Sequence, residues 1–137
     1  MITYKFQLMV LLTYNEPSKG RSHMSVIIRK VLSRNDVSET DAHQAGMYIL
    51  KESVPFFPRL GTNMLNPRVT LRFEDEERKF WTFDFIYYNN AYFGGTRDEY
   101  RLTPMNDYFC LYGIKAGDII ILEKADNGKL KIRHEKP

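Results

Sequence analysis

The sequence is short of the residues that much enzyme chemistry needs, and each shortage excludes a class of protein. With one cysteine, Cys110, the chain of 137 residues cannot be held by internal disulfides, which fits a reducing compartment. The three histidines lie far apart without a cysteine pair beside them, so no zinc-ligand spacing is present. The Gly-x-Ser-x-Gly motif of many hydrolases is also missing.

The sequence has no apolar run long enough to cross a membrane. Residues 2–14 are largely apolar, but Lys5 and Gln7 interrupt them and no small-residue cleavage site follows, so they do not fit a signal peptide. Apolar and polar residues alternate over positions 2–10, which is typical of a β-strand. We therefore expect a cytoplasmic protein without a membrane partner.

The composition is that of one ordinary globular domain. Hydrophobic residues make up 43% of the chain and charged residues 27%, so the chain is neither disordered nor in need of a stabilising metal. The net charge of +3 is too small to indicate a nucleic-acid partner by itself. Any such partner must be inferred from where the charged residues lie.

Alternation of apolar and polar residues recurs along the chain and predicts a mainly β domain. It predicts seven strands, at residues 2–10, 25–32, 68–73, 79–88, 97–102, 118–123 and 129–134. A short apolar segment at 47–50, a helical turn at 51–54 and a short helix at 104–112 complete the expected elements. Many short strands with close turn signals indicate a closed or nearly closed barrel.

Candidate catalytic residues are few. Cys110 has aromatic and aliphatic neighbours, and we expect it to be a buried structural thiol. The acidic tract 74–77 fits a solvated hairpin tip. Glu77 and Lys79 have the Glu-x-Lys spacing of a Mg²⁺-dependent nuclease, but without an upstream Pro-Asp partner. We predict no metal, no cofactor and no complete active site, and keep a nuclease using Glu77 and Lys79 as an alternative.

The segment 93–101 has the most distinctive pattern in the chain. In an extended backbone Arg97, Glu99 and Arg101 share one face, with residues 96, 98 and 100 on the other. Arginine can bond guanine O6 and N7 together, and a carboxylate can accept from cytosine N4, so this row suits G·C pairs in a major groove. The alternative is a ladder of salt bridges on a solvated sheet face.

A second polar segment, residues 33–44, offers further groups for bases and phosphates. Arg34, Asn35, His43 and Gln44 can all bond bases or phosphates. Its acidic residues, Asp36 among them, argue against simple phosphate binding. A plain surface loop is the alternative.

Read together, these segments resemble the N-terminal effector-binding domain of EcoRII-type restriction endonucleases. The resemblance covers about residues 26 to 103 and keeps the order of its motifs. The matching stretches are Asn35-Asp36, His43-Gln44, Gly46 with Tyr48-Ile49, Leu65-Asn66-Pro67, Ile86-Tyr87-Tyr88-Asn89, and Phe93-Gly94 through Thr96-Arg97 to Glu99 and Arg101. The stretch from Gly113 to Asp118 before a strand is similar to the end of the wider B-three-type DNA-binding domains of plant transcription factors.

The resemblance implies a seven-stranded DNA-binding pseudobarrel with two short helices. Such domains clamp duplex DNA with two arms in the major groove, which here would be the N-arm at residues 34–48 and the C-arm at residues 95–101. The predicted DNA-binding residues are Arg34, Asn35, Asp36, His43, Gln44, Tyr48, Thr96, Arg97, Asp98, Glu99 and Arg101. Where the family has lysines in the C-arm, this chain has Gly95 and Tyr100, so we expect fewer or differently placed phosphate contacts.

We therefore expect residues 23–137 to form the DNA-binding domain and residues 1–22 to form an extension, either a strand or a linker. The expected function is recognition of a short G·C-containing site in double-stranded DNA, as the target-recognition or effector domain of a type II restriction endonuclease. Arg34 and Arg72 are candidate phosphate contacts. The expected partners are DNA and a nuclease domain in the same polypeptide or a partner chain, in a bacterial cytoplasm. A DNA-binding regulator without a nuclease partner is a further alternative.

Overall fold

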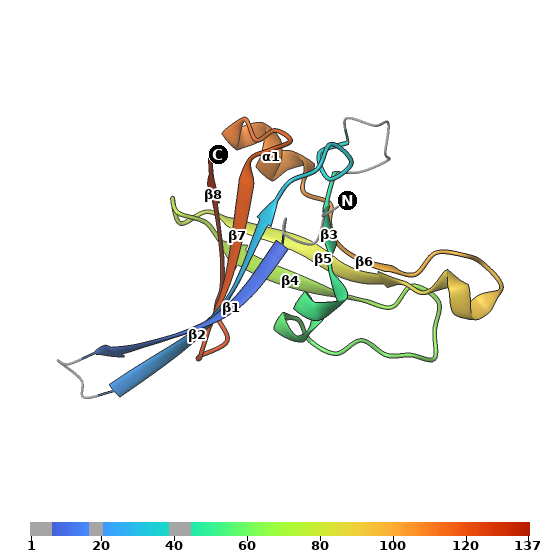
Figure 1. The fold of residues 1–137 in the computed structure, drawn as a ribbon, viewed down its shortest axis with the longest axis horizontal. Coiled ribbons are helices and arrows are strands. Elements are labelled where there is room, and N and C mark those ends of the chain that lie inside the picture. The colour runs from blue at the N-terminus through green and yellow to red at the C-terminus, as the bar shows by residue number, and fades with distance from the viewer. Residues whose placement is uncertain (1–6, 17–20, 39–44) are drawn as a thin grey trace.

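One curled sheet makes up most of the molecule (Figure 1). The computed structural model describes residues 7–16, 21–38 and 45–137, and for residues 7–16 and 21–24 it describes the backbone alone. The strands are β1 (Gln7–Glu16), β2 (Arg21–Val31), β3 (Met47–Ile49), β4 (Arg68–Glu74), β5 (Phe80–Tyr88), β6 (Glu99–Thr103), β7 (Ile119–Ala125) and β8 (Leu130–Glu135). Their order across the sheet is β1-β2-β7-β8-β4-β5-β6-β3.

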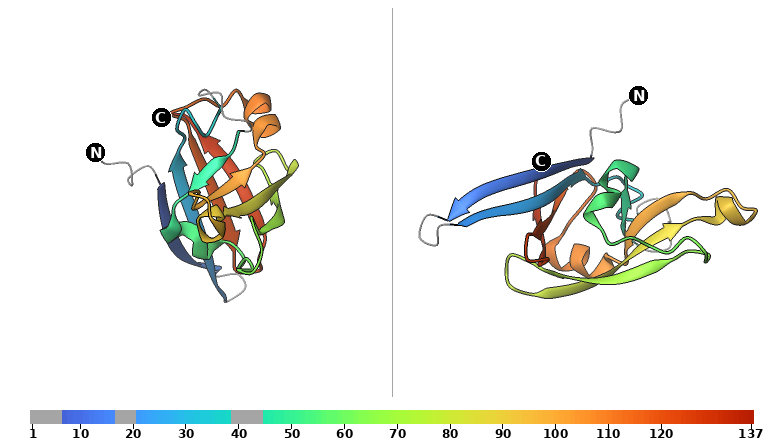
Figure 2. Two further views of the ribbon diagram at one scale, coloured as in Figure 1. Left: turned by 90° about the vertical axis from the view of Figure 1, so that its right-hand side faces the viewer. Right: turned by 90° about the horizontal axis from the view of Figure 1, so that it is seen from below.

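The sheet curls into a pseudobarrel, which confirms the expected mainly β fold. Strands β2 to β8 form the curl, and β1 adds an eighth strand by antiparallel pairing at the edge beside β2. A parallel pair, Glu74 with Lys131, joins β4 to β8 and so connects the two halves of the sheet. Figure 2 shows the β1–β2 hairpin extending from one end of the molecule and the β5–β6 connection from the other.

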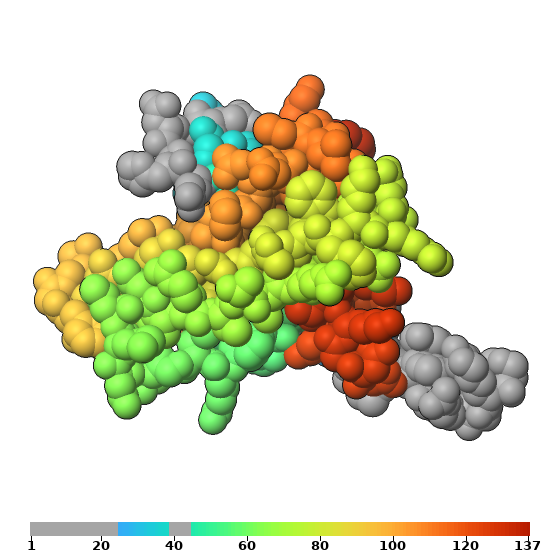
Figure 3. All heavy atoms as spheres, turned by 180° about the vertical axis from the view of Figure 1, so that it is seen from behind, coloured from blue at the N-terminus to red at the C-terminus, as the bar shows by residue number. Residues whose placement is uncertain are grey.

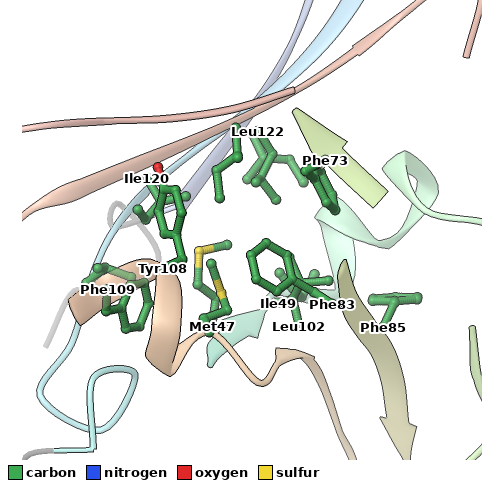
Figure 4. Packing of buried hydrophobic residues seen from close by; sticks show 14 of the residues in the cluster. Met47, Ile49, Phe73, Phe83, Phe85, Leu102, Tyr108, Phe109, Ile120 and Leu122 are labelled. Atoms are coloured by element: carbon green, nitrogen blue, oxygen red, sulfur yellow. The ribbon is translucent and has the colours of Figure 1, made fainter. Parts of the chain in front are cut away.

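Aromatic side chains fill the space inside the curl. Phe73, Phe83 and Phe85 from β4 and β5 are at most 2% exposed, because the alternation in each strand turns these positions inward. They pack with Met47, Ile49, Leu102, Ile120, Leu122 and Tyr108 (Figure 4). Burial of this apolar surface is the main favourable contribution to folding.

Short helical segments connect the strands in the described part of the chain. They are η2 (Lys51–Phe56), η3 (Asn90–Phe93) and α1 (Asn106–Tyr112). The α1 helix turns Tyr108 and Phe109 toward the core and ends at Gly113, whose φ of 60° suits glycine. No helix in the described part of the chain is long and apolar enough to cross a membrane.

Several local expectations differ from the structure. The described part of the first strand is Gln7–Glu16, which extends past the predicted end at residue 10, while residues 2–6 of that prediction lie outside the described residues. The short segment after residue 46 forms β3 because it pairs with β6. The expectation for Cys110 was wrong: its thiol is exposed, because α1 turns its neighbours Tyr108 and Phe109 inward instead.

The acidic tract at the β4–β5 turn is only partly solvated. Glu76 and Glu77 are exposed, but Asp75 is 7% exposed. Its carboxylate accepts hydrogen bonds from the backbone N–H groups of Glu77 and Lys79 and from the indole of Trp81, besides a short one from the hydroxyl of Tyr112. Although burial opposes ionisation, the bonds from Tyr112 and Trp81 hold the pKa of Asp75 below its usual range. This carboxylate therefore closes the turn and ties it to α1.

Candidate functional site

Two loops border the outer face of strands β3, β6 and β5. From here on the N-arm is residues 33–46, between β2 and β3, of which 33–38 and 45–46 are described, and the C-arm is residues 89–98, between β5 and β6; these bounds replace the 34–48 and 95–101 expected from the sequence. Figure 3 shows the β4–β5 side of the molecule, with described N-arm residues in cyan at upper left and the C-arm in gold at the far left.

The outer face of β6 carries the mixed-charge row that the alternation predicted. Glu99 lies opposite Tyr88 of β5, and Arg101 lies opposite Tyr48 of β3, so these four side chains share one face. The Nε atom of Arg97 is 3.3 Å from Oε1 of Glu99, and the Nε atom of Arg101 is 2.6 Å from Oε2. The row is therefore one connected ionic group.

The carboxylate in the middle of this row is held in its charged form. Burial by itself would raise the pKa of Glu99, but the hydrogen bond and charge of Arg101, followed by those of Arg97, hold the pKa below its usual range. The guanidinium of Arg97 also lies 3.7 Å from the ring centroid of Tyr88. This stacking and the bond from Nε orient Arg97, while 45% of its side chain stays exposed.

Asp98 lies on the opposite side of the C-arm from this row. Its Oδ2 atom is 2.8 Å from Nζ of Lys51 in η2, and its Oδ1 atom accepts a hydrogen bond of 2.6 Å from the hydroxyl of Tyr87. The bonds from Lys51 and then from Tyr87 hold the pKa of Asp98 below its usual range. Asp98 therefore ties the C-arm to the helix beside it.

Asp36 is buried at the base of the N-arm, with 0% exposure. Its carboxylate accepts hydrogen bonds from the backbone N–H groups of Ser33, at 2.9 Å, and Tyr48, at 3.0 Å. Its backbone carbonyl accepts a third bond, of 2.8 Å, from the N–H of Gly46. Asp36 thus joins the first and last residues of the N-arm, and it has no surface through which to touch a ligand.

Two cations surround Asp36. The Nζ atom of Lys30, in β2, is 3.1 Å from Oδ2 of Asp36, and Nη1 of Arg101 is 3.7 Å from Oδ1. Burial lowers the pKa of Lys30 below its usual value, while the charge of Asp36 opposes that shift. Arg101 is also mostly buried, with 14% of its side chain exposed, and its Nη1 donates to the carbonyl of Gly46 at 3.1 Å.

The remaining predicted residues have different settings. Arg34, Asn35 and Thr96 are exposed on the two arms, and Tyr48 is half-buried between the cations of Lys30 and Arg101. His43 and Gln44 lie outside the described residues. The structure therefore brings Tyr48, Arg97, Glu99 and Arg101 together, and places Asp36 beneath them and Asp98 behind them.

The sequence analysis missed Lys30, Lys51 and Tyr88. Lys30 lies two residues from each of the buried positions Ile28 and Leu32 and so shares their face of the strand, which predicts that it points inward and needs a buried partner. Tyr88 lies on the outer side of the predicted hairpin, and pairing β5 with β6 would have identified it as a neighbour of Glu99. Nothing in the local sequence pointed to Lys51.

The residues of the alternative nuclease lie elsewhere, at the β4–β5 turn. Nζ of Lys79 is 3.7 Å from Oε1 of Glu77, and both side chains are more than half exposed. Within the described residues, no group of three or more His, Cys, Asp or Glu side chains is arranged to hold a metal ion. A pocket of about 480 Å³ lies between this turn and β8, lined by Glu74, Asp75, Glu76, Arg78, Lys129, Lys131, Ile132 and Arg133, and none of these lining residues belongs to either arm.

Comparison with known proteins relates this arrangement to one family. Residues 20–123 match the family model of the N-terminal domain of restriction endonuclease EcoRII. The type II restriction enzyme EcoRII of Escherichia coli is 40% identical over 83 residues, which cover 54% of this chain and 19% of that enzyme. The chain thus matches less than a fifth of the length of this curated relative.

The fold also matches that of a plant protein. The structure described as an Arabidopsis FUS3–DNA complex has a TM-score of 0.62 to this chain at 22% sequence identity. The match covers 79% of this chain and 94% of the plant chain. The two proteins therefore share the pseudobarrel fold of the B-three-type domains.

Proposed function

This chain belongs to the family of the N-terminal domain of restriction endonuclease EcoRII, and we propose that it binds a short, specific sequence in double-stranded DNA. In this proposal it is the target-recognition or effector domain of a type II restriction endonuclease. The observation that carries the proposal is the row of Arg97, Glu99 and Arg101 on an outer sheet face bordered by the two arms.

The geometry of Arg97 suits the reading of guanine. Among the described residues its Nε atom is paired with Glu99 and its guanidinium plane lies against Tyr88, so the two terminal nitrogens have no protein partner. Two parallel donors of this kind match the O6 and N7 acceptors of guanine in the major groove. Because Arg97 is already oriented, binding costs little side-chain entropy.

Glu99 complements Arg97. A carboxylate has about four acceptor positions, so an oxygen bound to one arginine can still accept from the N4 amino group of cytosine. The depressed pKa of Glu99 keeps this acceptor charged at neutral pH. An arginine beside a carboxylate therefore favours a target that contains G·C pairs.

The N-arm and the tip of the C-arm supply the other proposed DNA contacts. Exposed donors and acceptors suit base edges and phosphates on either side of the central row. We propose for this role the exposed residues Arg34, Asn35 and Thr96 and the half-buried Tyr48, with Arg101 contributing the exposed part of its side chain. His43 and Gln44, which lie outside the described residues, are proposed for the same role. Arg72, exposed on the outer face of β4 and lying 3.8 Å from the ring centroid of Phe80, is the proposed phosphate contact on the sheet.

Recognition of this kind needs no metal or cofactor and no catalytic group in this chain. The matched part of the E. coli enzyme is 19% of its length, which supports a nuclease domain elsewhere, in the same polypeptide or in a partner chain. The proposed setting is the bacterial cytoplasm, where the DNA target is found.

Selection of duplexes from a random pool tests this proposal. The wild-type chain is expected to enrich one short motif containing G·C pairs, at a fixed salt concentration. Binding that depends on salt but not on sequence would contradict it, because phosphate contacts alone behave in that way. A DNA-binding regulator without a nuclease partner would also enrich one motif. The adjoining coding sequence distinguishes a regulator from a restriction-endonuclease domain, because the second requires a nuclease domain there.

A cleavage assay addresses the alternative nuclease. The chain is incubated with plasmid and Mg²⁺, and we expect no cleavage. Cleavage that the substitution Glu77→Ala abolishes would favour the alternative at the β4–β5 turn and overturn the non-catalytic role.

A further inference from the structure

The buried residue Asp36 connects parts of the molecule that are distant in sequence. Its carboxylate holds the backbone at Ser33, at the start of the N-arm, and at Tyr48, in β3 after the N-arm, so that the N-arm leaves and re-enters the barrel at one point. Gly46 allows this closure, since a Cβ atom there would come within 2.6 Å of the carbonyl oxygen of Leu102 in β6. The N-arm is therefore packed directly on the strand that carries the mixed-charge row.

Lys30 bridges the open side of the sheet at the same place. Strands β2 and β3 are not neighbours in the sheet order, yet Nζ of Lys30 in β2 donates a hydrogen bond of 2.8 Å to the carbonyl of Tyr48 in β3. The same nitrogen is ion-paired with Asp36. A buried lysine needs such a partner, because an unpaired charge away from water is costly.

Arg101 links Asp36 to Glu99 on the outer face of β6. Its guanidinium lies between the Asp36 carboxylate and the carbonyl of Gly46 on one side and Glu99 on the other. The position of Glu99, and through it that of Arg97, is therefore set partly by contacts that begin at the base of the N-arm. Neither Lys30 nor Asp36 is exposed enough to touch DNA, with side-chain exposures of 8% and 0%.

We propose that Asp36 and Lys30 are positioning residues that determine DNA specificity without touching DNA. They fix the N-arm against β6 through Arg101, so that the groups on both arms face the same few base pairs. This inference rests on the proposed function. It predicts that loss of the pair lowers discrimination between sequences more than it lowers attraction to phosphates.

The test compares Asp36→Asn with Asp75→Asn. Both aspartates are buried and close a loop by accepting backbone N–H bonds, but Asp75 lies at the β4–β5 turn and has no contact with Arg101. The affinity of each variant is measured for the duplex that the wild-type chain selects and for a scrambled duplex of the same composition, below the melting temperature of both variants. The ratio of the two affinities is the readout.

We expect Asp36→Asn to lower this ratio by about 5- to 150-fold, the discrimination that one correctly placed base contact provides, and Asp75→Asn to leave it within about twofold. In an Arg101→Ala background, Asp36→Asn should lower the ratio little further, because both substitutions interrupt the same connection. If Asp36→Asn keeps the wild-type ratio, or lowers it independently of Arg101, the inference is wrong.

One further variant separates folding from positioning, and the wild-type chain separates this inference from the proposed function. Lys30→Met with Asp36→Asn removes both charges and so avoids an unpaired buried lysine. If this double variant melts like the wild type but still loses discrimination, the inference is supported. If it regains full discrimination, the pair serves folding alone. Absence of sequence preference in the wild-type chain would instead count against the proposed function.

Discussion

The two arms are anchored by the same pair of residue types in opposite surroundings. Asp36 with Lys30 holds the N-arm inside the protein, with both side chains at most 8% exposed, whereas Asp98 with Lys51 holds the C-arm at the surface, at 32% and 59% exposure. An ion pair in water contributes little to stability, but removal of one partner from a buried pair leaves a charge without solvent. Loss of Asp36 from the N-arm should therefore lower the free energy of unfolding far more than loss of Asp98 from the C-arm.

Aromatic stacking takes the place of a buried ion pair in the C-arm. The rings of Phe57 and Phe85 are stacked with centroids 4.0 Å apart, those of Phe85 and Tyr100 are 5.5 Å apart, and those of Tyr100 and Tyr87 are 4.1 Å apart. This ladder runs along the inner side of β5 and β6, behind the mixed-charge row. The strands β5 and β6, which flank the C-arm, are thus held by aromatic contacts, whereas the base of the N-arm is held by charges.

The largest expected effect follows from removing the Asp36 carboxylate, which holds the N-arm together with Lys30. Asp36→Ala should lower the free energy of unfolding by about 3–5 kcal/mol, because Lys30 then remains buried without its partner. Urea denaturation followed by circular dichroism measures the loss. Asp98→Ala is the matched control on the C-arm, and it should cost much less because Lys51 is already in solvent. Equal losses in the two variants would remove the distinction between the arms.

The next largest expected effect is on the affinity and sequence preference of DNA binding. Arg97→Ala should weaken binding of the selected duplex by about 1–3 kcal/mol and relax the sequence preference at one position. Arg72→Ala, the comparison variant on β4, should weaken binding to all sequences alike and reduce the salt slope by about one. Titrations of selected and scrambled duplexes at several salt concentrations separate the two. An Arg97→Ala variant that binds every sequence as the wild type does would disprove the role of the C-arm.

A smaller effect tests the aromatic ladder. Tyr100→Leu keeps an apolar side chain but removes the stacking with Phe85 and Tyr87, and each such pair contributes about 0.5–1.5 kcal/mol beyond its buried area. We expect a loss of this order per pair in the free energy of unfolding, measured by urea denaturation. Unchanged stability would mean that burial alone holds the C-arm.

The smallest effect is a pH dependence of the mixed-charge row. Because the pKa of Glu99 is lower in the folded chain than in the unfolded one, its ionisation stabilises the fold fully above the unfolded pKa of about 4.3. This contribution is lost as pH falls through the lower, folded pKa. The difference in stability between the wild type and Glu99→Gln should therefore be largest near pH 7 and shrink below about pH 4. A constant difference across this range would contradict the depressed pKa.

Much of the sheet could be predicted from the sequence because its information is local. Alternation in residues 68–73 and 79–88 identified the β4–β5 hairpin and its buried aromatic face, and alternation in residues 97–101 identified the neighbours of Glu99. These patterns depend on the two-residue period of a strand and on nothing further away.

The anchors could not be predicted in this way, because their contacts depend on the tertiary fold. In the sequence Asp36 is one of several polar residues in a loop. Only Lys30 and Arg101, which approach it from other strands, make it a buried carboxylate paired with two cations. Alternation places Asp98 on the side of its segment opposite the row. Its two partners there, the hydroxyl of Tyr87 and the amine of Lys51, reach it only through the tertiary fold. Both aspartates were predicted from the sequence as DNA-binding residues, and the fold separates them from the row of Arg97, Glu99 and Arg101.

Methylation interference at guanine N7 tests the central claim most directly, since N7 lies in the major groove. The duplex selected by the wild-type chain is methylated sparsely, bound and unbound DNA are separated, and the guanines at which methylation prevents binding are identified. We predict interference at one or more guanines of the motif, and its loss at one guanine in Arg97→Ala. Binding that is indifferent to N7 methylation at every guanine would contradict a mixed-charge row reading the major groove.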